Sequence, residues 1–143
     1  MYFCKFELIY YMTKERNNIT EGEVLARLAA QGIDSKKGLD CVLLDLREVP
    51  SAPTSFFVIC SGNVPLHTTA ICDGVFETIK RATGLNPHRI EGYDNGEWIL
   101  MDYFDVIVHI FLKEKRSHYR LEELWADGRT VNYEPLKPNS DAR

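Results

Sequence analysis

The sequence has 143 residues, of which 45% are hydrophobic and 27% are charged, and a formal net charge of -4. This length suits one domain with a single core, and the composition excludes both an intrinsically disordered chain and a protein built from membrane-spanning segments. The acidic balance argues against a broad basic surface that would hold nucleic acid by counterion release, so we expect no strong direct nucleic-acid binding.

The chain begins with a stretch that is rich in aromatic residues but carries Lys5 and Glu7. It lacks the uncharged segment of a secretory signal, is too short to span a bilayer, and does not have the arginine-rich, acid-poor character of an organelle presequence. We interpret residues 1–19 as a flexible extension in which Met12 offers an alternative start. The chain has four cysteines, Cys4, Cys41, Cys60 and Cys72. No two of them have CxxC spacing and two lie in apolar runs, which indicates reduced, buried thiols in a reducing compartment.

Helix and strand signals follow one another through the first half of the chain. Thr20 and Glu23 have the spacing of a capping box and precede apolar residues at helical spacing, which predicts a helix over about Glu21–Asp34. The short apolar runs 41–46 and 56–60 have the composition of buried strands.

The second half begins with another helix. Pro65 suits its first turn and Gly84 its C-terminal cap. The alternating segment His88–Glu91 predicts an edge-like strand, and residues 98–111 predict a hairpin of two largely buried strands. A last helix is expected over Glu114–Trp125, with its apolar side chains toward the sheet.

These elements define an α/β (or α+β) fold with a single mixed sheet of about five strands and flanking helices. The connection through the second helix requires at least one parallel strand pair, whereas the hairpin supplies an antiparallel pair. We expect this domain to occupy residues 20–128. Residues 129–143 contain two prolines and few apolar side chains, and are expected to form a flexible tail.

The hairpin stretch EWILMDYFDVIVHIF interrupts its apolar runs with Asp102, Tyr103, Phe104 and Asp105. These four residues predict the turn, which would place both aromatic rings in water. The two aspartates have two interpretations: either each carboxylate accepts hydrogen bonds from backbone N–H groups, or the pair binds divalent metal as in enzymes that transfer nucleotidyl groups. Because they stand three apart across a turn, their carboxylates need not converge, and we favour the first.

The remaining patterns do not predict an active site. The histidines at positions 67, 88, 109 and 118 fall on different elements, and His109 lies within an apolar strand where a hydrogen-bonded core residue is expected. The segment Ser61–Asn63 before a helix contains one glycine, which is a weak signal for an anion site. We therefore expect no cofactor and no enzymatic activity, and keep a metal-dependent nucleotidyltransferase as the alternative.

Trp98 indicates a different kind of function. It stands at the start of a strand beside a turn. A large aromatic side chain in such a place either anchors a protein interface or packs at the end of the core. The sequence pattern leaves both interpretations open.

Four segments carry a resemblance that covers about Thr20 to Gly128 in order. They are DCVLLDLREV, SFFVICSGN, HRIEGYDNGEWILMDYFDVIVHIF and EKRSHYRLEELWADG. Together they resemble the ribosomal silencing factor family, also called the RsfS or Iojap family. The string W-x-x-x-D-Y-x-D-V-x-V-H-x-F, with L-W-A-D, is specific for it.

This resemblance implies a fold like that of nucleotidyltransferases but without their catalytic motif. It also implies a cytoplasmic protein that binds the large ribosomal subunit through ribosomal protein L-fourteen, prevents the small subunit from joining, and damps translation when nutrients fall. An assembly role on the large subunit is the alternative within the family. The free protein is expected to form a homodimer.

The resemblance further assigns hairpin residues to partner binding. Their expected roles are an aromatic anchor for Trp98, complements to basic groups for Asp102 and Asp105, and additional contact area for Leu100, Met101 and Tyr103. The chain also departs from the family, which usually has glycine where Phe104 stands. If the turn needs a positive φ there, phenylalanine is strained.

Overall fold

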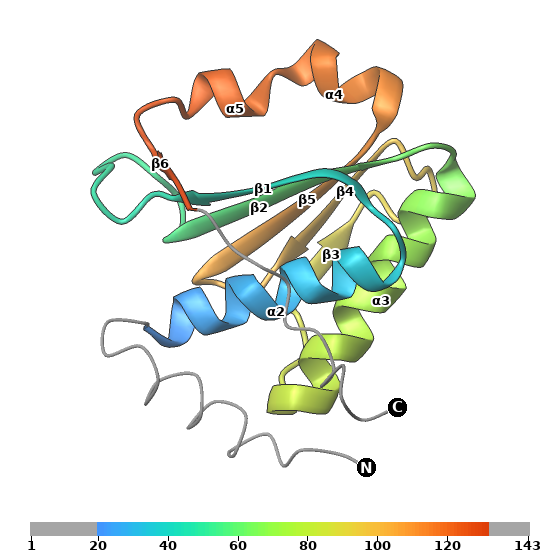
Figure 1. Ribbon diagram of the computed structural model, residues 1–143, viewed down its shortest axis with the longest axis horizontal. Helices are drawn as coiled ribbons and strands as arrows, with labels where there is room; N and C mark the ends of the chain where they lie inside the picture. Colours follow the sequence, from blue (N-terminus) through green and yellow to red (C-terminus); the bar gives the residue numbers. More distant parts are fainter. Residues whose placement is uncertain (1–19, 132–143) are drawn as a thin grey trace, which may run out of the picture.

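The computed structural model describes residues 20–131 (Figure 1). The elements in chain order are α2 (Glu21–Ser35), β1 (Leu39–Asp45), β2 (Phe56–Gly62), α3 (Pro65–Thr83), β3 (Arg89–Glu91), β4 (Trp98–Asp102), β5 (Val106–Leu112), α4 (Lys113–Tyr119), α5 (Leu121–Leu124) and β6 (Arg129–Thr130). The six strands of this part of the chain form one mixed sheet in the order β3-β4-β5-β2-β1-β6. The α/β fold class is therefore confirmed, with one strand more than predicted.

The strand pairing follows the predicted topology. β2 and β5 are parallel, whereas β4 and β5 form the antiparallel hairpin. The additional strand, β6, lies in the stretch expected to be a loose tail, where Arg129 pairs with Asp45 of β1. A strand of two residues has no periodic pattern that would reveal it. The predicted extension 1–19 and the tail from 132 onward lie outside the described residues.

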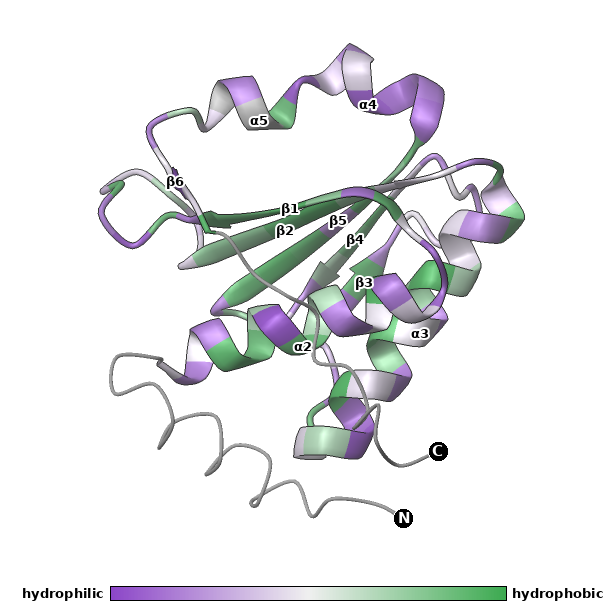
Figure 2. Ribbon diagram, viewed as in Figure 1, coloured by the Kyte–Doolittle hydropathy of each residue, from purple (hydrophilic) through white to green (hydrophobic). Residues whose placement is uncertain are grey.

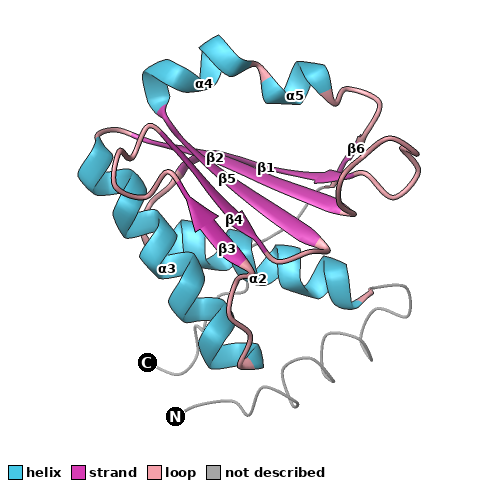
Figure 3. Cartoon of the chain, turned by 180° about the vertical axis from the view of Figure 1, so that it is seen from behind, coloured by secondary structure: helices cyan, strands magenta, loops and turns pink. Residues whose placement is uncertain are grey.

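Helices α2 and α3 lie together on one face of the sheet (Figures 1 and 3). The hydroxyl of Thr20 accepts a hydrogen bond from the Glu23 N–H at 3.2 Å, as the capping box predicts. Helix α3 begins with Pro65 and is capped by Gly84, whose φ of 80° is the left-handed conformation that glycine adopts without strain. Within residues 20–131, no helix combines the length and apolarity needed to cross a membrane.

Helices α4 and α5 lie on the opposite face, and Figure 2 shows hydrophobic strands between the two helical layers. The prediction of one continuous last helix was wrong, because the chain adopts a left-handed conformation at Arg120, with φ of 47°. No residue of α4 is buried, whereas Leu121 after the break is 7% exposed. The break turns Leu121 and Trp125 onto a second core cluster that includes Phe57 and Phe111.

Candidate functional site

Strand β4 directs its side chains alternately to the two faces of the sheet. Ile99 and Met101 are fully buried in the main core beneath α2 and α3. Trp98, Leu100 and Asp102 point to the opposite face and are only partly buried. The hairpin therefore contributes to the core with one set of residues and to the surface with the other.

Two of the six predicted contact residues belong to the core. Met101 is 0% exposed and Tyr103 is 6% exposed. Tyr103 continues the alternation beyond the end of β4, so it turns inward like Met101, and burial raises the pKa of its hydroxyl. Their assignment as contact area is corrected accordingly, and of the two aromatic residues in the turn only Phe104 meets water.

The two aspartates of the turn have different surroundings. Asp102 accepts a hydrogen bond from the backbone N–H of Phe104 at 2.8 Å, and its other carboxylate oxygen lies 3.5 Å from Nε of Arg89. This geometry corresponds to the turn-stabilising interpretation of Asp102. Asp105 is exposed, and its backbone carbonyl accepts from the N–H of Phe56. Within residues 20–131, no three His, Cys, Asp or Glu side chains form a group that could hold a metal ion.

Phe104 occupies the turn in the left-handed region, with φ of 69°. Its side chain is 66% exposed and its ring lies 4.5 Å from the ring of His88. The hydroxyl of Thr54 donates to the Phe104 carbonyl at 2.6 Å, which helps to hold this conformation. The turn thus requires a positive φ at this position, and a residue with a Cβ atom is strained there.

We predict that the Phe104→Gly variant is more stable than the Phe104→Ala variant by about 1 kcal/mol, since only glycine removes the left-handed strain. The alanine variant is the matched control, because both substitutions remove the contact with His88. Urea unfolding followed by far-ultraviolet circular dichroism measures the difference. Equal stability of the two variants would show that the turn relaxes to a different φ.

Trp98 is held by three neighbours while remaining partly exposed. Its ring stacks on Phe111 with centroids 5.1 Å apart, and the ring of Tyr119 lies 4.5 Å away. Its indole N–H donates to Nδ1 of His109 at 3.1 Å. The indole thus packs against the second core cluster, as one interpretation predicts, and is still partly exposed, so its role as an interface anchor stays a prediction.

Ile107 was missed as a site residue. It pairs with Asp102 across the hairpin, so its side chain shares the face of Leu100 and Asp102, and it is partly exposed. No period-two alternation marks it in the sequence, because its neighbours Val106 and Val108 are apolar as well. We call the set Trp98, Leu100, Asp102 and Ile107 the open hairpin face.

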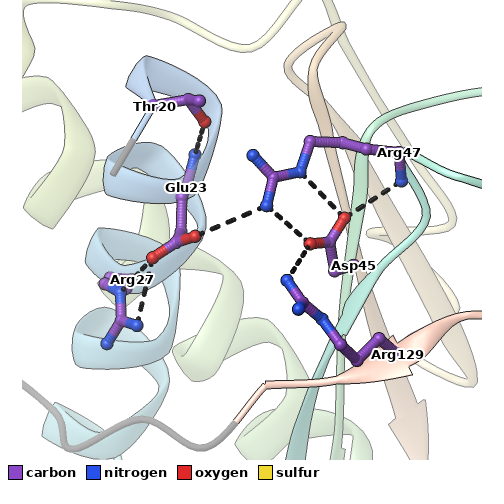
Figure 4. Close-up of polar contacts among 6 residues, drawn as sticks. All are labelled: Thr20, Glu23, Arg27, Asp45, Arg47 and Arg129. Atoms are coloured by element: carbon purple, nitrogen blue, oxygen red, sulfur yellow. Dashed lines mark hydrogen bonds and ion pairs between the residues drawn. The ribbon is translucent and has the colours of Figure 1, made fainter. Parts of the chain in front are cut away.

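A second feature that the sequence did not reveal is a charged cluster where α2, β1 and β6 meet (Figure 4). Asp45 accepts hydrogen bonds from Nε and Nη2 of Arg47 at 2.9 and 2.6 Å, and from Nη2 of Arg129 at 2.9 Å. The carboxylate oxygens of Glu23 lie 3.8 Å from Nη2 of Arg47 and 3.1 Å from Nη2 of Arg27. The hydrogen bonds from Arg47 lower the pKa of Asp45 to about 2. We interpret this cluster as structural, because it connects three elements.

A family model described as "Ribosomal silencing factor during starvation" matches residues 19–143. The ribosomal silencing factor RsfS of Halalkalibacterium halodurans is 37% identical over 110 residues, which cover 77% of this chain and 92% of that protein. The RsfS of Bacillus subtilis is 35% identical over 103 residues, covering 72% and 86%. A mouse protein named mitochondrial assembly of ribosomal large subunit protein 1 is 34% identical over 74 residues, covering 50% of this chain and 32% of that protein.

Solved structures agree with this match. A crystal structure from Bacillus halodurans has a TM-score of 0.67 and 34% identity, covering 78% of this chain and 99% of that chain. A crystal structure from Chromobacterium violaceum has a TM-score of 0.70 and 29% identity, covering 85% and 100%.

Fold and site define a single-sheet α/β domain whose aromatic hairpin is partly open to solvent. The chain belongs to the ribosomal silencing factor family. Its bacterial relatives are named as silencing factors and not as enzymes.

Proposed function

We propose that this protein binds the large ribosomal subunit through ribosomal protein L-fourteen and sterically prevents the small subunit from joining. Translation would thereby be repressed in the cytoplasm when nutrients are limiting, without a cofactor or a catalysed reaction. Family membership supports the ribosomal role, and the family's description links it to starvation. A steric mechanism needs only affinity and position, so it does not require a catalytic constellation.

The open hairpin face is the observation that carries this proposal. Helices α4 and α5 bring Leu121 and Trp125 onto the second core cluster around Phe57. Beside this cluster, Leu100 and Ile107 are only partly buried. Apolar residues next to a fixed aromatic ring are the kind of centre that dominates protein interfaces.

Charged groups around this face would orient the partner. Asp102 keeps some exposure, with 15% of its side chain accessible, and Asp105 is exposed at the adjoining turn. Arg89 and Glu91 of β3 pair with Asp102 and Leu100, and both are exposed. Such rim charges adjust the rate and specificity of association more than the affinity itself. Basic groups of L-fourteen would be complementary to the two aspartates.

We predict that Trp98→Ala weakens binding to isolated large subunits by at least about tenfold, as expected for a central aromatic anchor. Co-sedimentation measures the binding, and circular dichroism checks that the variant is folded. Phe76→Ala is the matched control, because it removes a 37% exposed aromatic ring from α3, on the far side of the sheet. Unchanged binding by a folded Trp98→Ala variant would contradict the anchor assignment.

A subunit-joining assay tests the steric step separately. Small subunits are added after the protein has bound large subunits, and joined ribosomes are quantified on a gradient. Loss of joined ribosomes supports silencing, whereas binding without that loss supports an assembly factor, the candidate that the name of the mouse relative favours. Failure of the wild-type protein to bind large subunits would overturn both.

We also propose that the free protein is a homodimer, since an edge strand with unpaired backbone groups and a partly apolar face both favour association. Strand β3 is such an edge, because it pairs only with β4 within the described sheet. Analytical ultracentrifugation is expected to give twice the monomer mass at micromolar concentration. A monomer across that range would contradict this proposal.

A further inference from the structure

His109 combines burial with an incomplete set of hydrogen bonds. It lies in the middle of β5 and is 4% exposed. Its Nδ1 accepts the hydrogen bond from the indole N–H of Trp98 at 3.1 Å. Its Nε2 is buried and has no hydrogen-bond partner within residues 20–131.

The hydrogen bond from Trp98 determines which ring nitrogen of His109 carries the proton. Burial lowers the pKa of His109 to about 4, so the ring is neutral at pH 7. Because Nδ1 accepts from an N–H donor, the single proton of the neutral ring is on Nε2. Nδ1 of His109 therefore accepts the hydrogen bond from Trp98, whereas the N–H at Nε2 is unpaired in the core of the described residues.

Packing alone does not account for a histidine at this position. Its neighbours are aromatic: Phe57 meets the imidazole edge-on at 4.6 Å, and Phe111 is stacked at 6.2 Å. A leucine or phenylalanine would fill such a site without burying an unpaired N–H group, which costs free energy. The compensating interaction is the hydrogen bond with Trp98.

This hydrogen bond selects one orientation of the indole. Stacking on Phe111 and the tilted contact with the Tyr119 ring restrain the plane of the Trp98 indole. An indole flipped by half a turn about its bond to Cβ would keep that plane and could make the same ring contacts. Only one of these orientations points the indole N–H at Nδ1 of His109. The neutral imidazole thus distinguishes between them.

We propose that His109 is a positioning residue, which holds the Trp98 indole in the one orientation that the ribosomal partner binds. This inference rests on the proposed function and adds to it a buried residue that does not touch the partner. Pre-organising an anchor lowers the cost of ordering it on binding. Loss of the imidazole acceptor therefore weakens binding even though the exposed surface keeps its composition.

Four variants test this role. His109→Leu removes the acceptor, whereas His109→Asn keeps an acceptor oxygen near the place of Nδ1. Trp98→Phe removes the donor and keeps an aromatic ring, and the fourth variant combines Trp98→Phe with His109→Leu. Co-sedimentation with large subunits gives affinities, and nitrogen-15 spectra follow the indole N–H of Trp98, which is assigned by its loss in Trp98→Phe.

We expect His109→Leu to weaken binding about fivefold to tenfold, as loss of one ordinary hydrogen bond would do, and to shift the Trp98 indole signal. His109→Asn is expected to restore both readouts to near the wild-type values. In the Trp98→Phe background, His109→Leu should cause no further loss. A role in core packing alone would instead predict equal losses in both backgrounds and no rescue by asparagine.

The outcomes separate this inference from the function on which it rests. If His109→Leu binds large subunits as tightly as the wild-type protein does, the positioning role is overturned and the proposed function stays intact. Equal losses in both tryptophan backgrounds overturn it as well. If the wild-type protein does not bind large subunits, the proposed function fails and the inference fails with it.

Discussion

Replacing Gly32 with alanine is expected to lower the free energy of unfolding by about 2–4 kcal/mol, because the added methyl group would meet the backbone of a neighbouring helix. Gly32 lies where α2 crosses α3. A Cβ atom on it would stand 2.7 Å from Cα of Val75 and 2.8 Å from the carbonyl oxygen of Gly74. Relief of these contacts requires the two helices to move apart and to open the core between them.

Gly22→Ala provides the control within the same helix. Its added Cβ atom would meet a ring carbon of Phe56 at 3.2 Å, and a side chain can shift more easily than a helix backbone. We expect this control to change the free energy of unfolding by less than about 1 kcal/mol, because gained helix propensity offsets part of the contact. Urea unfolding measures both variants. Wild-type stability of Gly32→Ala would mean that the helices cross less closely than described.

Replacing Asp45 with asparagine is expected to lower the free energy of unfolding at pH 7 by about 2–3 kcal/mol, because it removes the carboxylate that Arg47 and Arg129 share. The Asp45 side chain is 6% exposed, so its charge is poorly compensated by water. Arg129 is 74% exposed and contributes less than Arg47, since solvent screens it. Asp94→Asn, at an exposed position, controls for the change in net charge.

The same carboxylate predicts a pH dependence. Its pKa in the folded protein, about 2, lies below its ordinary value of 3.8, chiefly because Arg47 donates hydrogen bonds to the ionised form. A lowered pKa stabilises the fold above pH 4, and this contribution is lost as the pH falls from about 4 to 2. Stability curves of the wild type and Asp45→Asn should therefore converge toward pH 2. A constant gap across that interval would show that the carboxylate charge does not act in this way.

The local elements of the fold were predicted where a few neighbouring residues determine them. The capping box at Thr20, the proline and glycine at the two ends of α3, and the polar turn between two apolar strands all depend on contacts within a few residues. The break at Arg120 was not predictable in this way. It depends on Leu121 reaching the second core cluster, which is a contact between distant parts of the chain.

The candidate site was likewise predictable from the sequence only in part. The hairpin and the partial exposure of Trp98 could be predicted from the order of residues, as could the family to which the chain belongs. Which hairpin residues meet the surface could not, because the buried face of β4 is set by the helices that cover it. Met101 and Tyr103 face α2 and α3 and are buried, whereas Leu100 and Ile107 share the other face.

By itself, the sequence determined the family and the order of the elements other than β6 and the break between α4 and α5, since these follow from residue types at short, regular spacing. Tertiary structure alone decided which side chains of the hairpin are buried. It also decided the hydrogen bond between Trp98 and His109 and the one between Asp45 and Arg129, which are 84 residues apart. These contacts arise only when sheet pairing brings distant strands into register. A shift of one residue in that register would turn every side chain of a strand to the other face.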